Sequence, residues 1–220
     1  MRTKLAAILA VLTAAAASLA LGVGPAAAAP SVAIGGGSGI LLPLDQTEDL
    51  ACTVTTIGHD GTGHLIGLTA GHCGAPGRAV FAEYKPAAGQ IGVVDYVNTD
   101  LDYAVISFDP AKVTPLRTVN GVTIAGVSLN QPSFPSIACK TGRSTGNTCG
   151  ITWFSDGISH YTQICVDHGD SGSPVVIGNQ LVGMVNAFYF VGCFGPETGT
   201  NIGPILNDMN AHQIRGFHVA

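Results

Sequence analysis

Short apolar runs separated by glycine-containing turns limit this chain to a fold built from β-strands. Of its 220 residues, 30 are glycine and only 10% are charged, and apolar residues at helical spacing are scarce. Glycine accommodates the tight turns that join neighbouring strands, so this composition predicts an all-β protein. The clearest case is a hairpin whose strands cover residues 51–57 and 64–70, with a turn at 59–63.

The first 29 residues have the features of a secretory signal peptide. Arg2 and Lys4 precede an apolar, alanine-rich run, and small residues at 26–29 provide a cleavage site. We predict cleavage after Ala28, because Pro30 disfavours cleavage immediately before it. The alternative is a membrane anchor, which the alanine-rich run and the small residues that follow it disfavour. We therefore expect a secreted, extracellular protein with no stable membrane insertion after the signal peptide is removed.

The charge balance argues against a nucleic-acid partner. The chain has nine basic and 14 acidic residues, and removing the signal peptide takes away two basic residues and no acidic ones. Seven basic residues then remain, the net charge is about −7, and no basic patch is left for nucleic acid. The remaining residues are enough for one substantial core or for two small barrels.

Six cysteines in a chain with a predicted signal peptide indicate disulfide bonds. Sequence alone does not choose among the pairings that six cysteines allow. A metal site is the alternative, but the sequence contains no Cys-x-x-Cys or His-x-x-His pair. We therefore expect no metal and no cofactor.

Three separate motifs contain the residue types of nucleophilic catalysis. Ser171 lies in the run Gly-Asp-Ser-Gly-Ser-Pro, His72 lies in Thr-Ala-Gly-His-Cys, and Asp102 precedes an apolar run. A serine hydroxyl is a weak nucleophile until a base removes its proton, so a Ser–His pair is the minimum for acyl transfer. The order His, Asp, Ser argues against an α/β-hydrolase esterase, which needs a different order and a Gly-x-Ser-x-Gly turn.

In this order and with matching cysteines, the motifs resemble those of secreted serine proteases of the chymotrypsin-like fold. In detail they resemble the bacterial streptogrisin branch, and the resemblance runs from about Ile34 to the C-terminus. It implies two packed antiparallel six-stranded β-barrels. Residues 206–212, preceded by Pro204, suit a short C-terminal helix. The resemblance also implies a protein or peptide substrate, and we expect a monomer.

We divide the chain on this basis into three parts. They are a signal peptide (1–29), a flexible, glycine-rich N-terminal segment (30–44) and a serine protease domain (45–220), with one barrel at about 45–118 and the other at about 119–220.

The resemblance implies a role for each motif residue in a serine endopeptidase that works through an acyl-enzyme. His72 is the expected general base, Asp102 the acid that orients it and Ser171 the nucleophile. Asp100 competes with Asp102, but Asp102 directly precedes the apolar run, as the acid does in the family. The backbone N–H groups of Gly169 and Ser171 are the expected oxyanion hole. The implied disulfides are Cys52–Cys73, Cys139–Cys149 and Cys165–Cys193.

Asp170, beside the expected nucleophile, needs a cation if it is buried. In the streptogrisin branch an internal arginine supplies this cation, and Lys140 stands at that place here. We therefore predict a buried Lys140–Asp170 ion pair. Arg143 is the alternative cation, and the amino group of Ile34, released by proteolysis, is a weaker one.

The expected substrate pocket departs from the family pattern. Asn186, Ala187 and Phe188 stand where the family commonly has a serine followed by small residues, and Val166 is expected to line one wall. Phe188 either enters the pocket and admits only small side chains, or points outward. We predict cleavage after small or apolar residues. Cleavage after basic residues through Asp167 is the alternative, which we disfavour because Asp167 has the wrong alternation if its segment is extended.

A catalytically silent binding module with the same fold is the second class of function that we consider. Its support is Phe188, together with Ser173 in place of the second glycine of the family motif. An intact set of three catalytic residue types argues against it.

Overall fold

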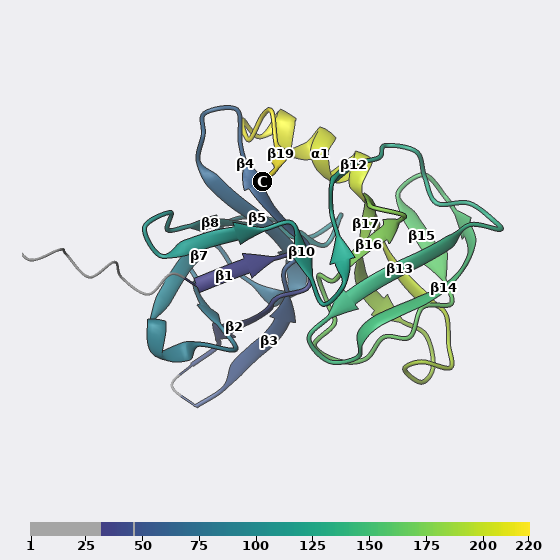
Figure 1. Cartoon of the computed structure of the whole chain (residues 1–220), viewed down its shortest axis with the longest axis horizontal. Helices are drawn as coiled ribbons and strands as arrows, with labels where there is room; N and C mark the ends of the chain where they lie inside the picture. The colour runs from purple at the N-terminus through teal and green to yellow at the C-terminus, as the bar shows by residue number, and fades with distance from the viewer. Residues whose placement is uncertain (1–31, 46) are drawn as a thin grey trace, which may run out of the picture.

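The computed structural model describes residues 32–45 and 47–220, so the predicted signal peptide and its cleavage site lie outside the described residues. Within them the fold is mostly β-strand, with one α-helix, α1 (Ile202–Ala211), and two 3-10 helices, η1 (Gly71–Cys73) and η2 (Pro86–Ala88). Figure 1 shows two β-sheet bodies side by side, with α1 along one edge of the pair. No helix in the described part of the chain is long and apolar enough to span a membrane.

The first body is an antiparallel sheet of eight strands. Along the sheet the order is β19-β4-β5-β8-β7-β6-β2-β3. The strands are β2 (Gly39–Pro43), β3 (Asp49–Thr53), β4 (Thr56–His59), β5 (Leu65–Ala70), β6 (Ala79–Ala82), β7 (Gln90–Asn98), β8 (Tyr103–Phe108) and β19 (His218–Val219).

The second body contains a closed six-stranded barrel. Strand β17 pairs with β16 on one side and with β18 on the other, which closes the ring β17-β16-β13-β14-β15-β18. These strands are β13 (Ile137–Gly142), β14 (Gly146–Ser155), β15 (Ser159–Thr162), β16 (Pro174–Ile177), β17 (Gln180–Phe188) and β18 (Glu197–Asn201), and β12 (Gly126–Val127) adds to β17 in parallel.

Short pairs of strands lie outside both sheets. Strand β1 (Val32–Gly35) runs parallel to β9 (Val113–Leu116), and β10 (Thr118–Val119) forms a small hairpin with β11 (Val122–Thr123).

The structure confirms the all-β class, one closed six-stranded barrel and the short C-terminal helix. Closure of the other barrel stays a prediction, because β3 and β19 are the end strands of the eight-stranded sheet. The expected assignment of residues 119–220 to the second barrel also needs correction at the C-terminus. His218 pairs with His59 of β4, so the last strand belongs to the first body rather than to the second.

The prediction of a flexible segment over 30–44 is wrong for the residues that the structure describes. Strands β1 and β2 occupy most of this range, and Ile34 is fully buried. Its glycines serve close packing: a Cβ on Gly36 would lie 2.5 Å from the backbone oxygen of Thr55, and Gly37 has a φ of +102°. Glycine at these places therefore reflects contact and turn geometry rather than mobility.

An apolar cluster joins the two bodies. Leu68 and Tyr103 of the first body pack in one cluster with Met184 of β17 and with Ile202 and Met209 of α1. All five are fully buried. Residues carried by the ends of these strands are therefore held in a constant relation across the interface.

Candidate active site

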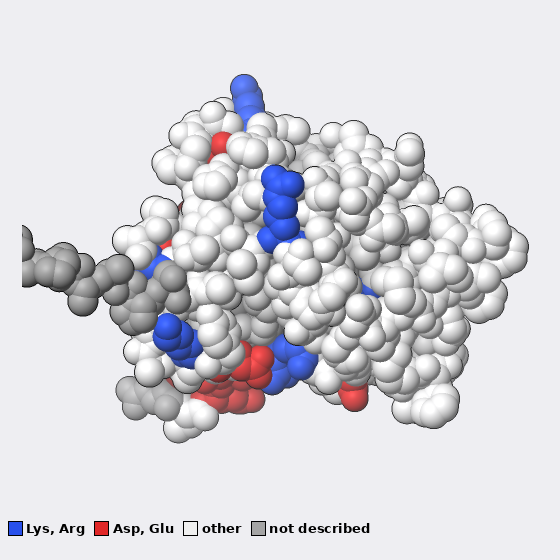
Figure 2. Space-filling view, viewed as in Figure 1, with Lys and Arg blue, Asp and Glu red and all other residues white. Residues whose placement is uncertain are grey.

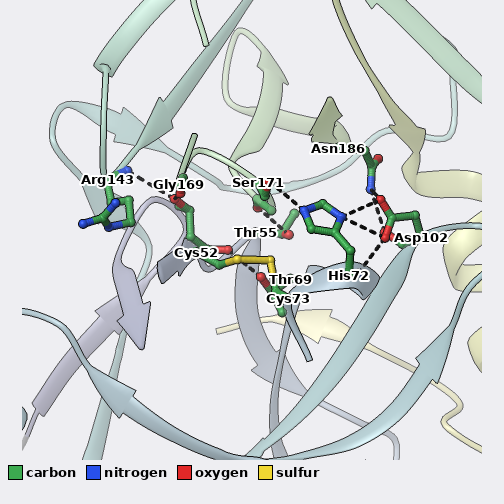
Figure 3. The surroundings of a disulfide bond; sticks show 12 residues. Cys52, Thr55, Thr69, His72, Cys73, Asp102, Arg143, Gly169, Ser171 and Asn186 are labelled. Atoms are coloured by element: carbon green, nitrogen blue, oxygen red, sulfur yellow. Dashed lines mark hydrogen bonds and ion pairs between the residues drawn. A yellow bond between two sulfur atoms is a disulfide. The ribbon is translucent and has the colours of Figure 1, made fainter. Parts of the chain in front are cut away.

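Ser171, His72 and Asp102 meet where the two bodies face each other (Figure 3). His72 lies in η1, just after β5; Asp102 lies in the turn before β8; and Ser171 lies in the turn before β16. Ser171 Oγ is 2.8 Å from His72 Nε2, and His72 Nδ1 is 2.9 Å from Asp102 Oδ2. Because the carboxylate can only accept, Nδ1 carries the imidazole proton and Nε2 faces the serine hydroxyl as an acceptor.

Local structure brings His72 and Asp102 together within the first body. Ala70 of β5 pairs with Tyr103 of β8, which places the residues just beyond these strand ends side by side. The backbone N–H of His72 donates to Asp102 Oδ1 at 2.8 Å, and the Cys52–Cys73 disulfide ties η1 to β3. Asp100, the competing acid, is exposed in the preceding turn, where its N–H bonds to the side chain of Asn98.

The environment of Asp102 favours its ionised form. Burial raises the pKa of Asp102, but hydrogen bonds from the ring and backbone of His72, together with one from Asn186, outweigh burial and hold the pKa below its usual value. The His72 side chain is 47% exposed and the Asp102 side chain 33%. The acid is thus a charged acceptor behind an imidazole that a ligand can reach.

Threonines of the first body hold the Ser171 turn. Thr53 Oγ1 donates to the Gly169 oxygen at 2.9 Å, and Thr55 Oγ1 donates to the Gly172 oxygen at 2.6 Å. The N–H of Thr53 also donates to the Ser171 oxygen at 2.9 Å. Sequence analysis did not identify these threonines, because no motif links positions so far apart in the chain.

Two backbone donors beside Ser171 are free to bind an anionic oxygen. Gly169 and Gly172 have φ values of +94° and +87°, so the turn needs glycine at both places. The N–H of Asp170 bonds to the Asp167 oxygen at 3.0 Å. Among the described residues, the N–H groups of Gly169 and Ser171 have no acceptor, as an oxyanion hole requires.

Asp170 is fully buried beneath the turn and has a charged partner. Lys140 Nζ lies 3.2 Å from Asp170 Oδ2, and both side chains are fully buried. The carboxylate also accepts the N–H groups of Asp167, Ser144 and Thr145 at 3.0–3.2 Å. Burial lowers the pKa of Lys140, and the charge of Asp170 opposes this effect. The predicted ion pair is therefore present in the structure.

The two alternative cations are engaged elsewhere. Arg143 forms an ion pair with Glu83 across the interface between the bodies, and its Nε lies 2.8 Å from Glu83 Oε2. Ile34 lies inside β1, opposite Pro115 of β9. The three disulfides are those that the resemblance implied, and they are Cys52–Cys73, Cys139–Cys149 and Cys165–Cys193.

A cavity of about 380 Å³ opens beside Ser171. Its lining consists of His72, Ser171, Asp167, His168, Val185, Asn186, Ala187 and Phe188. Phe188 is half-buried in the wall, and its ring forms a T-shaped contact with His168 at 5.5 Å between centroids. The phenyl ring therefore borders the cavity without filling it.

Three residues of the expected pocket lie differently from the sequence-based expectation. Val166 is not among the lining residues but packs in a buried apolar cluster with Val185. The segment that carries Asp167 is not a strand, so the alternation argument fails, and exposed Asp167 does line the cavity. The Asn186 side chain turns toward Asp102, to which its Nδ2 donates at 2.8 Å.

A second, larger cavity lies away from these residues. It has a volume of about 840 Å³, and its lining includes Glu83, Tyr84, Asn120 and Arg143. None of Ser171, His72 and Asp102 lines it, whereas Ser171 and His72 both line the smaller cavity. Among the described residues, no group of three or more His, Cys, Asp or Glu side chains could hold a metal ion.

Comparison of the sequence with known proteins finds two relatives, which are both bacterial. Streptogrisin-C of Streptomyces griseus is 29% identical over 133 residues, which cover 54% of this chain and 28% of the relative. Serine protease 1 of Rarobacter faecitabidus is 30% identical over 136 residues, which cover 54% of this chain and 26% of the relative. The chain thus matches little more than a quarter of the length of these relatives. No protein-family model matches it.

Among solved structures, Thermobifida fusca protease A superimposes with a TM-score of 0.67 at 23% identity. The match covers 81% of this chain and 97% of that protease. The two chains therefore share one fold over almost the whole of the described domain.

Proposed function

We propose that this chain, a streptogrisin-like protein of the chymotrypsin fold, is a serine endopeptidase that hydrolyses peptide bonds through an acyl-enzyme on Ser171. One observation carries the proposal: Ser171 Oγ is 2.8 Å from His72 Nε2, whose ring in turn bonds to Asp102 at 2.9 Å. A nucleophile, a base and an orienting acid at such distances are the requirement for acyl transfer.

In the first step, Ser171 Oγ attacks the carbonyl carbon of the scissile bond while His72 Nε2 takes the hydroxyl proton. The carbonyl oxygen becomes an anion, which the N–H groups of Gly169 and Ser171 stabilise. The imidazolium then protonates the leaving nitrogen, the C–N bond breaks, and an ester remains on Ser171. Water attacks this ester with His72 again as the base, which releases the carboxylic acid and restores the serine.

The peptide backbone of the substrate would add to an open edge of β17. Strand β16 pairs with β17 only as far as Met184, so residues Asn186–Phe188 have no strand on that side within the described chain. An extended peptide can form main-chain hydrogen bonds to such an edge. By resemblance, this is the strand that pairs with the substrate.

We propose that cleavage follows small or apolar residues, because Val185, Ala187 and Phe188 supply much of the cavity wall. Cleavage after basic residues is the second candidate, since the Asp167 side chain lines the same cavity and is exposed. A lysine or arginine would lay its apolar stem along the wall and bring its charge to this carboxylate.

We further propose that the protein acts outside the cell as a monomer on protein or peptide substrates. Three disulfides support an oxidising compartment. On the face shown in Figure 2, basic side chains are scattered rather than gathered in a patch, which argues against nucleic acid as the partner.

A fluorophosphonate probe and a peptide library together test the proposal. We expect the purified mature protein to react with the probe and to cleave the library, and the Ser171→Ala variant to do neither. A folded protein that is not labelled and cleaves no peptide would contradict the endopeptidase proposal and favour a silent binding module. The residues found before the cut decide between apolar and basic preference.

A further inference from the structure

The loop that joins β17 to β18, residues 189–195, presents apolar side chains to solvent. Its sequence is Tyr-Phe-Val-Gly-Cys-Phe-Gly, with no charged residue. Phe190 is 92% exposed and Phe194 is 87% exposed, and the side chains of Tyr189 and Val191 are exposed as well. Burial of such side chains would be favourable, so their exposure is a cost to the folded protein. Neighbouring apolar side chains that stay in solvent mark interaction sites.

Aromatic side chains of the adjacent strands extend this apolar surface. The rings of Phe154 and Tyr161 stack at 4.4 Å between centroids, and those of Tyr161 and Tyr189 at 6.4 Å. The amide of Gln163 accepts from Trp153 Nε1 at 3.3 Å and donates to a backbone oxygen of the loop at 3.3 Å. The chain has eight Phe, five Tyr and one Trp, so nearly half of them lie here. We call this surface the aromatic patch, and it consists of Trp153, Phe154, Tyr161, Tyr189, Phe190 and Phe194.

The aromatic patch continues the wall of the smaller cavity. Phe188 lines that cavity and is the last residue of β17, so the loop begins where the cavity wall ends. The loop also packs against another residue of the lining, because a Cβ on Gly192 would lie 3.4 Å from Asp167 Cγ. The Cys165–Cys193 disulfide joins the two segments. A peptide that leaves the cavity along the open edge of β17 therefore meets the aromatic patch.

The charges around the aromatic patch indicate which partner it suits. Strands β14, β15 and β18 contain one Asp, Glu, Lys or Arg, which is Glu197, and its side chain is fully buried. The turn between β14 and β15 contains Asp156, whose carboxylate accepts the N–H groups of Ile158 and Ser159 at 3.0 and 2.8 Å. On the face shown in Figure 2, few charged side chains cover the second body, at the right. The surface therefore favours an apolar partner over a charged one.

We propose that the aromatic patch is an exosite, which binds an apolar segment of the protein substrate outside the cavity; this inference rests on the proposed function. An extended chain advances about 3.4 Å per residue, so the edge at Asn186–Phe188 accommodates about three substrate residues. The apolar segment therefore begins about four residues from the bond that is cleaved. Its side chains pack against the exposed rings of Phe190 and Phe194, which a shorter peptide does not reach.

The expected substrates are thus proteins with an apolar, weakly charged stretch next to the cleavage site. Continuity with the cavity is the reason to assign the aromatic patch to the substrate. A lipid surface or a second copy of the chain could use the same side chains, but neither requires them to lie beside Ser171.

Peptides that share one cleavable sequence test the exosite. The short peptide spans only the cavity, and the long peptides add a segment rich in phenylalanine and leucine either before or after the cut. We expect one of the two extensions to lower KM about tenfold in the wild type, as partial burial of a phenyl ring predicts, with kcat within about twofold. An extension of serine and glycine with the same length should not lower KM.

Substitution of the two exposed rings should remove this gain. With Phe190→Ser and Phe194→Ser combined, the ratio of KM between short and extended peptide should fall below about two. Leu129→Ser is the matched control, because Leu129 is 69% exposed but lies between β12 and β13, outside the aromatic patch. It should keep the tenfold ratio. Calorimetry on Ser171→Ala protein repeats the comparison as binding without turnover.

Two outcomes overturn the exosite while leaving the proposed function intact. One is a wild type that needs Ser171 for cleavage but has the same KM for short and extended peptides. The other is a gain in KM that survives loss of both rings. If that double variant instead dissociates a dimer in sedimentation, or no longer binds phosphatidylcholine vesicles, the aromatic patch belongs to a second copy or to a lipid surface. Absence of any Ser171-dependent cleavage would contradict the proposed function itself.

Discussion

Substitution of Lys140 by methionine tests whether the buried ion pair beside Ser171 supports the fold. Lys140 and Asp170 are both fully buried, with Nζ 3.2 Å from Oδ2. Methionine keeps an unbranched apolar stem but has no charge and no donor. The substitution therefore leaves the Asp170 carboxylate buried without its cation.

The expected loss follows from the groups that remain around Asp170. Removing one partner of a buried ion pair costs about 3–5 kcal/mol. Asp170 would still accept three backbone N–H groups and the Thr145 hydroxyl, so the low end of this range applies. We expect a decrease of about 3 kcal/mol in the free energy of unfolding. For a domain of this size, that lowers Tm by about 6–12 °C.

Urea and thermal unfolding measure this loss, with every variant also carrying Ser171→Ala to prevent self-digestion. Lys140→Met, Asp170→Asn and the double variant complete a cycle. The double variant should be less destabilised than the sum of the single variants, because it buries no unpaired charge. A loss under about 1 kcal/mol for Lys140→Met, or strict additivity in the cycle, would refute the reasoning.

Three further predictions concern single carboxylates. Asp102→Asn should leave Tm nearly unchanged and lower kcat about 10⁴-fold. Asp100→Asn should change kcat little in the same steady-state assay. Equal losses of kcat in the two variants would contradict the proposal that Asp102 is the orienting acid. Burial raises the pKa of Asp60, but hydrogen bonds from Thr62 and His64 lower it from 3.8 to about 2. The stability that this lowered pKa provides is complete above the unfolded pKa of 3.8 and is lost as the pH falls toward 2. Acid-unfolding curves should therefore show that Asp60→Asn destabilises the protein less and less as the pH falls from 3.8 to about 2. If Asp167 recognises basic residues, Asp167→Asn should lower kcat/KM for lysine and arginine peptides and spare apolar ones; an equal effect on both would remove the basic alternative.

Much of the fold and of the candidate site can be predicted from short stretches of the sequence. Glycine-punctuated apolar runs predict strands because turn geometry and side-chain alternation are local properties of the backbone. Ser171, His72 and Asp102 stand in short motifs, and the structure brings them together at 2.8 and 2.9 Å. The buried partner of Asp170 was also predictable, because a buried charge requires a cation nearby.

Contacts between segments that lie far apart in the chain could not be predicted from short stretches of the sequence. The glycine-rich segment near Gly36 packs tightly instead of moving, because the atom that excludes a Cβ belongs to Thr55 of another strand. Asp167 faces the cavity because its segment turns rather than extends. Asn186, predicted to bind substrate, directs its amide at Asp102, 84 residues away in sequence.

Residue identity and short spacing are enough to name the chemical groups of the site and the strands that carry them. The direction of each side chain around those groups depends on atoms of the other body, which a local pattern does not contain. Only packing of the two bodies against each other decides that Thr53 and Thr55 hold the turn of Ser171, and that the Asn186 amide bonds to Asp102.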